Sequence, residues 1–145
     1  MKGKEQGFTM LEALFVLSIF LLMISISFLS LKPHHFQQER QLFFSQLKAD
    51  FLYAQQYAIT NQKLVRVNFI TAENYYYIRK QNGELLLKRE YADSIMVRGG
   101  SQKLHFYYHS NGNISTIGAI YIYIGENAYQ LMFQLGRGRF YVKRM

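Results

Sequence analysis

The 145-residue sequence has no cysteine and a single proline. The absence of cysteine excludes disulfide bonds, thiolate metal sites and cysteine nucleophiles. One proline favours long regular elements with few rigid turns. Half of the residues are hydrophobic and no segment has the composition of a flexible linker, so the sequence predicts one folded domain with an appendage.

Motifs of the common enzyme classes are also missing. The sequence has no nucleophile elbow, no zinc-protease motif and no phosphate-binding loop. His34 and His35 are adjacent, and His105 and His109 would share one face of a strand, but two ligands without a nearby carboxylate are too few for a metal site. We therefore predict a protein that is not an enzyme and that needs no metal or other cofactor.

Acidic residues are scarce in the C-terminal part of the chain. Residues 63–145 carry twelve basic and five acidic side chains, which gives seven of the eight net positive charges. A basic surface favours anionic partners such as nucleic acid, lipid head groups or wall polymers. An ordinary solvated surface has the same composition, so charge alone does not choose a partner.

A long hydrophobic run lies near the N-terminus. Residues 13–31 contain no charged side chain, and these 19 residues would form a helix of about 28 Å, close to the hydrocarbon thickness of a bilayer. The run is longer than the apolar core of a cleavable signal peptide, and no small-residue cleavage site follows it. Lys2 and Lys4 predict a cytoplasmic N-terminus, with everything after this single membrane span outside.

The next segment, residues 33–62, has the pattern of an amphipathic helix. Pro33 should kink or interrupt the helix at its start. Beyond it, hydrophobic residues recur at spacings of three and four, which makes one continuous stripe, while glutamine and charged residues, aspartate included, occupy the opposite side. The stripe consists of Phe44, Leu47, Phe51, Ala54 and Ala58, and it is widened by Phe43, Leu52 and Ile59.

Residues 63–145 change to the alternating pattern of β-strands. The segments separated by turn signals predict about seven short strands, and Asn82–Gly83 predicts a hairpin. In the last strand, Phe140 and Val142 should point the same way. With one long helix and no second, the sequence predicts an α+β fold, in which the outer half of the helix packs on an antiparallel β-sheet head.

The start of the chain, KGKEQGFTMLEALFVL, resembles the class III signal of type IV pilins and of the pseudopilins of type II secretion. In that family a prepilin peptidase cuts after the glycine, on the cytoplasmic side, and methylates the new N-terminal residue. The resemblance implies cleavage between Gly7 and Phe8 and N-methylation of Phe8. Residues 1–7 would be the leader, and residues 8–32 would remain as the transmembrane helix and, later, as filament core.

Glu12 is the only charged residue between Gly7 and Lys32. A buried carboxylate needs a partner, and the α-amino group of Phe8 in a neighbouring subunit can provide one. In a low dielectric this pair would fix the register of subunits in a filament, as a lone polar residue does in a coiled coil. The alternative is a carboxylate that lies at the cytoplasmic interface without a role.

The resemblance extends into the head. SQLKADFLYAQQYAITNQKLVRVNF is similar to the H-type pseudopilin and FimT-like group, and LHFYYHSNGN and YQLMFQLGRGRFYV look like its late strand, glycine turn and closing strands. This implies a minor pilin of a Gram-positive competence pilus, which takes up extracellular DNA during transformation. It also implies partners: a major pilin, other minor pilins, a prepilin peptidase, an assembly ATPase and a platform membrane protein. The chain would move from the cell membrane to the cell surface.

Three alternatives stay open at this point. The chain could be a minor pseudopilin of a type II-like secretion machine, or an unprocessed membrane-anchored domain. It could also be a pilus-borne DNA-binding module, because basic residues pair with phosphates and tyrosine stacks on bases. The residues that would make this contact are Arg137, Arg139, Tyr141, Lys143 and Arg144, although a solvated edge strand has the same pattern.

Overall fold

The computed structural model describes residues 10–134 and 139–145, without the side chains of residues 27–36. The chain divides into two compact units, Met1–Gln38 and Glu39–Met145. One helix, α1 (Met10–Asn61), contributes to both. The interruption predicted at Pro33 is not found, because α1 passes through this residue although proline supplies no amide hydrogen to the helix.

The membrane span predicted over residues 13–31 lies partly outside the residues whose side chains are described. Within the described residues, no helix is both long enough and apolar enough to cross a membrane.

The C-terminal end of α1 is capped by backbone hydrogen bonds. Gln62 adopts a positive φ of 52°. The amide of Gln62 then donates to the Ile59 carbonyl, and the amide of Lys63 donates to the Ala58 carbonyl, at 3.3 and 3.2 Å. This is the Schellman arrangement, and it ends the helix beside the first strand.

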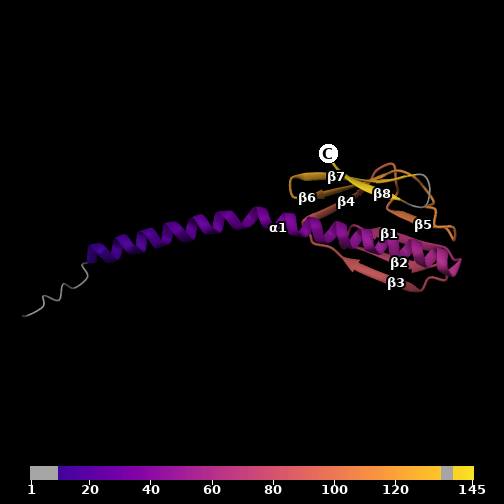
Figure 1. Ribbon diagram of the computed structural model, residues 1–145, viewed down its shortest axis with the longest axis horizontal. Helices are drawn as coiled ribbons and strands as arrows, with labels where there is room; N and C mark the ends of the chain where they lie inside the picture. The colour runs from indigo at the N-terminus through magenta and orange to yellow at the C-terminus, as the bar shows by residue number, and fades with distance from the viewer. Residues whose placement is uncertain (1–9, 135–138) are drawn as a thin grey trace, which may run out of the picture. The chain divides into compact units, whose positions relative to one another are not determined.

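The described part of the chain contains eight strands in two four-stranded antiparallel sheets (Figure 1). The first sheet has the order β3-β2-β1-β5 and the second has the order β4-β6-β7-β8. The strands are β1 (Val65–Ile70), β2 (Tyr75–Lys80), β3 (Leu85–Glu90), β4 (Ile95–Gly99), β5 (His105–Tyr108), β6 (Ala119–Ile124), β7 (Asn127–Phe133) and β8 (Phe140–Arg144). The predicted α+β fold is confirmed, and so is the hairpin at Asn82–Gly83, where Gly83 has a φ of 89°.

The hydrophobic stripe of α1 is confirmed at its centre and is wrong at one border. Leu47, Phe51, Ala54 and Ala58 have no exposed surface, and Phe43 is also buried. Leu52 and Ile59, which the pattern places at the edge of the stripe, are 50% and 37% exposed. The buried face of the helix extends instead to the side that carries Asp50. This residue is predicted on the solvent side but is only 6% exposed.

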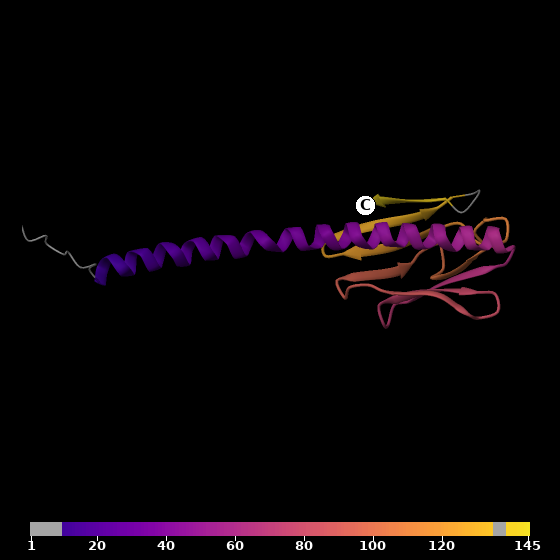
Figure 2. The same ribbon diagram turned by 60° about the horizontal axis from the view of Figure 1, so that its bottom comes forward.

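Phe51 joins the helix to both sheets. Its ring lies 5.5–6.4 Å from rings of the first sheet, Phe69, Tyr76 and Phe106, and 5.5–5.9 Å from Phe133 and Phe140 of the second. Figure 2 shows the last turns of α1 between the strands of the two sheets. A single hydrophobic core therefore holds the Glu39–Met145 unit together.

The buried carboxylate of Asp50 is held by two side chains of the first sheet. The hydroxyl of Tyr76 donates to Asp50 Oδ2 at 2.7 Å, and Nε of Arg89 lies 3.1 Å from the same oxygen. Burial, and then the hydrogen bond to Asp50, raises the pKa of Tyr76 above its ordinary value, so this hydroxyl keeps its proton and goes on donating. The pair of contacts fixes β2 and the edge strand β3 against the helix.

Asp50→Ala should lower the free energy of unfolding of residues 39–145 by about 1–3 kcal/mol, because the buried Tyr76 hydroxyl loses its acceptor. Asp50→Asn keeps an oxygen there and should cost less. Asp93→Ala removes an exposed carboxylate that accepts a hydrogen bond from Asn74, and it should change the unfolding energy by at most about 0.5 kcal/mol. Urea unfolding measures all three variants, and equal values for the two alanine variants would contradict the role of Asp50.

Candidate functional site

The N-terminal motif lies at the start of α1. Gly7 and Phe8, the predicted cleavage and methylation residues, are outside the described residues. Glu12 lies in the first turn of α1, and its side chain is exposed. A carboxylate in a first turn interacts favourably with the positive end of the helix dipole, so this position suits Glu12 whether or not a partner subunit is present.

The helix around and after Glu12 forms an apolar sleeve, by which we mean residues 10–26. All of its residues are exposed. Large hydrophobic side chains occupy the consecutive positions Leu14, Phe15, Val16 and Leu17, each more than half exposed. Four consecutive residues complete more than one turn of helix, so the sleeve has no polar side. A helix that is apolar all round is normally buried, so this one needs an apolar environment around it.

The serines within the sleeve satisfy their hydroxyls on their own helix. Ser18 Oγ donates to the Leu14 carbonyl at 2.7 Å, and Ser25 Oγ donates to the Leu21 carbonyl at 2.8 Å. Such bonds to the preceding turn leave no hydroxyl donor to be solvated. The two serines are therefore compatible with a surrounding from which water is excluded.

The C-terminal basic residues lie on or beside β8, which is an edge strand of the second sheet. Tyr141 is paired with Met132 and Lys143 with Gln130, so both side chains lie on one face, and Arg139 precedes the strand with an exposed side chain. Arg144 lies on the other face and donates to Asn127 Oδ1 at 2.5 Å. Arg137 is outside the described residues, and DNA contact by this group stays a prediction.

The inward face of β8 is only partly buried. Phe140 packs on the core, 5.7 Å from the ring of Phe133. Val142 points to the same face as Phe140, as predicted, because it pairs with the buried Leu131, but its side chain is 37% exposed. The reason is the position of β8 at the sheet edge, where β7 covers the strand on one side only.

The histidines form no metal site among the residues that the structure describes, since no group of three potential ligands is found there. His105 lies on β5, and the ring of His109 contacts that of Tyr107 at 5.0 Å. The side chains of His34 and His35 are not described.

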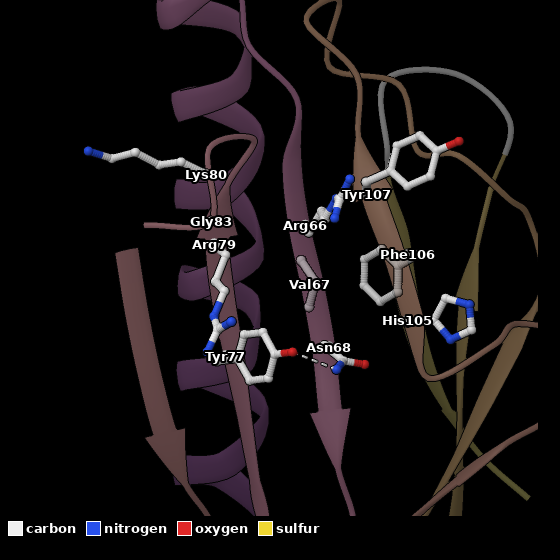
Figure 3. Close-up of a pocket in the computed structure, with 10 residues that line it drawn as sticks. All are labelled: Arg66, Val67, Asn68, Tyr77, Arg79, Lys80, Gly83, His105, Phe106 and Tyr107. Carbon is white, nitrogen blue, oxygen red and sulfur yellow. Dashed lines mark hydrogen bonds between the residues drawn. The ribbon is translucent and has the colours of Figure 1, made fainter. Parts of the chain in front are cut away.

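A second basic surface was not predicted. The outward face of the first sheet carries what we call the basic face, which consists of Arg66, Asn68, Tyr77, Arg79, Lys88, His105 and Tyr107. Figure 3 shows all of these residues except Lys88. The central part of the basic face forms a depression with a volume of about 420 Å³. The alternation of Arg66 and Asn68 with buried residues is a signal for one strand, but the register that joins four strands into one surface is not visible in the sequence.

The chain is similar to known proteins both at its N-terminus and over nearly its whole length. Residues 2–28 match the prokaryotic N-terminal methylation motif. Over 142 residues the chain is 30% identical to the competence protein ComGD of Bacillus subtilis strain 168, and the match covers 98% of this chain and 96% of that protein.

The fold is similar to that of a solved structure. A crystal structure of the type IV minor pilin FimU from Pseudomonas aeruginosa strain PAO1 superposes with a TM-score of 0.61 at 17% sequence identity, covering 74% of this chain and 90% of that one. A second crystal form of FimU gives a TM-score of 0.56 at 15% identity, with 68% and 88% covered. At these identities the likeness concerns the fold alone.

Proposed function

Since this chain belongs to the type IV pilin family, in the group of the competence protein ComGD, we propose that it is a minor pilin of a competence pilus that takes up extracellular DNA. Its role is structural rather than catalytic. The chain begins as a single-span membrane protein with a cytoplasmic N-terminus, and after processing it enters a filament at the cell surface.

The apolar sleeve of α1 is the observation that carries this proposal. Residues 10–26 are apolar on all sides and exposed, and the one carboxylate lies in the first turn. A membrane covers such a helix before assembly, and neighbouring helices cover it in a filament. The same surface thus serves both states, because lipid tails and packed apolar side chains are both free of water.

Cleavage between Gly7 and Phe8 leaves the sleeve attached to the head. It also creates a positive α-amino group four residues before Glu12. In the filament the amino group of one subunit meets Glu12 of its neighbour, and this pair sets the register. The partners of the chain are then a major pilin, other minor pilins and a prepilin peptidase, and indirectly an assembly ATPase and a platform protein.

A minor pseudopilin of a type II-like secretion machine would use the same N-terminal chemistry. The likeness to ComGD over nearly the whole chain supports the competence pilus instead. The genes beside this one distinguish the two systems, because a competence operon and a secretion operon encode different neighbours.

Complementation of a deletion strain tests the proposed function. The wild-type gene should restore transformation, and the mature protein should begin at Phe8, as intact-mass measurement would show. Gly7→Val should remain unprocessed and should not restore transformation, because a side chain at this position keeps the backbone away from the peptidase. A wild-type protein that still begins at Met1 in cells with the peptidase would contradict pilin processing. Unchanged transformation in the deletion strain would contradict the competence role.

A further inference from the structure

We propose that the basic face binds the phosphate backbone of duplex DNA. The surface itself follows from strand register and charge, whereas the choice of DNA among polyanions rests on the proposed function. This face is separate from the C-terminal residues 139–144, which lie on or next to the second sheet.

Strand register builds the basic face as two rows across the first sheet. In one row Lys88, Tyr77, Asn68 and His105 are direct neighbours on β3, β2, β1 and β5. In the next row Arg79, Arg66 and Tyr107 are neighbours on β2, β1 and β5. Since alternate residues of a strand share a face, both rows point away from the core, as the buried Val67, Ile78 and Phe106 confirm.

The pairing of Arg66 with Arg79 is unfavourable for folding. Like charges directly opposite each other on one face of a sheet are destabilising. Within the described residues, no salt bridge neutralises either guanidinium. Cζ of Arg79 lies 4.4 Å from the centre of the Tyr77 ring, a cation–π contact that holds the group in place and leaves its charge unpaired. A local conflict of this kind marks a surface selected for something other than stability.

The remaining groups fit a phosphate backbone. Lys88 lies over the Tyr75 ring at 4.3 Å and is paired with Glu90 at 3.1 Å, so its charge is partly offset at the sheet edge. The depression between the rows has no acidic residue among those that line it. Arginine binds phosphate in a bidentate manner, and Asn68, His105 and the tyrosine hydroxyls add polar side chains of the kind that contact the nucleic acid backbone.

The spacing of the cations suits a nucleic acid strand. Neighbouring strands of a sheet are about 4.8 Å apart, so Lys88, Arg79 and Arg66 extend across roughly 10 Å. The phosphates of one DNA strand advance by about 3.4 Å along the helix axis. Lys88 in one row and Arg79 and Arg66 in the next lie on three adjacent strands, so together they reach about three successive phosphates without any movement of the backbone.

Binding of a short labelled DNA duplex to the full chain in a non-ionic detergent tests the proposal. Arg66→Gln with Arg79→Gln should weaken binding at least about tenfold at low salt. The slope of log affinity against log salt should become less steep by about 0.9 for each phosphate that the variant no longer neutralises. The same double variant should melt at an equal or higher temperature, because the two like charges are removed. Its incorporation into filaments should equal that of the wild type.

Two matched variants make the result specific. Arg98→Gln with Lys103→Gln removes the same charge from exposed positions outside the basic face, and it should bind DNA nearly as well as the wild type. The second variant replaces Arg137, Arg139, Lys143 and Arg144 with glutamine.

If the Arg98 and Lys103 variant loses as much affinity as the Arg66 and Arg79 variant, or if only the C-terminal variant loses affinity, the basic face is not the DNA site. Binding of a glycerol phosphate polymer without binding of DNA would also overturn the proposal. A failure of filament assembly would leave these binding measurements unchanged and would count against the proposed function instead.

Discussion

Glu12→Val should reduce the amount of this subunit in sheared filaments by about tenfold or more, while its amount in the membrane stays unchanged. Valine makes the apolar sleeve more hydrophobic, so insertion and cleavage should proceed. In the filament proposed above, however, the α-amino group of the neighbour would lose its counter-charge. Loss of one partner from a buried ion pair costs about 3–5 kcal/mol, and about 1.4 kcal/mol is already a factor of ten in an equilibrium constant.

Glu12→Gln serves as the control for side-chain size. It keeps the length and hydrogen-bonding oxygen of glutamate and removes only the charge, so it should fall between wild type and Glu12→Val. Immunoblots of sheared and membrane fractions measure all three proteins. Incorporation of Glu12→Val at the wild-type level would mean that Glu12 serves only as a favourable charge in the first turn of α1, where the structure places it.

Phe51→Ala should destabilise the Glu39–Met145 unit by about 3–5 kcal/mol. Phe51 has no exposed surface and touches rings from both sheets, so the cavity cannot close by movement of one neighbour. Residues 39–145 contain the whole described core, and urea unfolding of this segment gives the change directly.

The neighbouring residue provides the matched control. Leu52 is 50% exposed although its side chain is also large and hydrophobic. Leu52→Ala should therefore change the unfolding energy by no more than about 0.5 kcal/mol. A loss of less than about 1 kcal/mol for Phe51→Ala, or equal losses for the two variants, would show that the buried side of the helix has been misassigned.

Local patterns predicted most elements of the fold. Hydrophobic residues recur with a period near 3.6 in the helix and with a period of two in the strands, and Asn82–Gly83 marks a hairpin. Each of these signals is contained within a few neighbouring residues. The division of the strands between two sheets could not be predicted in this way. It depends on the pairing of β1 with β5, whose residues are far apart in the chain, and side-chain alternation is the same for either partner.

The position of Asp50 shows why the predicted border of the helix stripe is misplaced. The spacings from Leu47 to Asp50 and from Asp50 to Ala54 are three and four, the same as those of a core position. The charge of aspartate nevertheless favours the solvent side when only the pattern is considered. Its partners Tyr76 and Arg89 are 26 and 39 residues away, so only the folded chain shows that the charge is satisfied.

The N-terminal motif and the basic face also differ in how much of each the sequence reveals. The N-terminal motif is contiguous, so the roles of Gly7, Phe8 and Glu12 could be proposed from the sequence alone. The basic face is assembled from four strands, and Arg66 and Arg79 become neighbours only through the register of β1 and β2. The net charge indicated a basic head but could not place the individual charges.

The order of strands in the two sheets has a consequence for how the subunit reaches its folded state. The chain passes between the sheets after β3, after β4 and after β5, so the sheets are interlaced along the sequence. The first sheet is incomplete until β5 is available, and the second until β8, the last strand, is available. Such long-range pairing makes folding slow and cooperative, and partly folded chains expose unpaired edges to proteases. A chain truncated before β8 therefore cannot complete the second sheet, so the order of the strands itself separates complete from incomplete subunits.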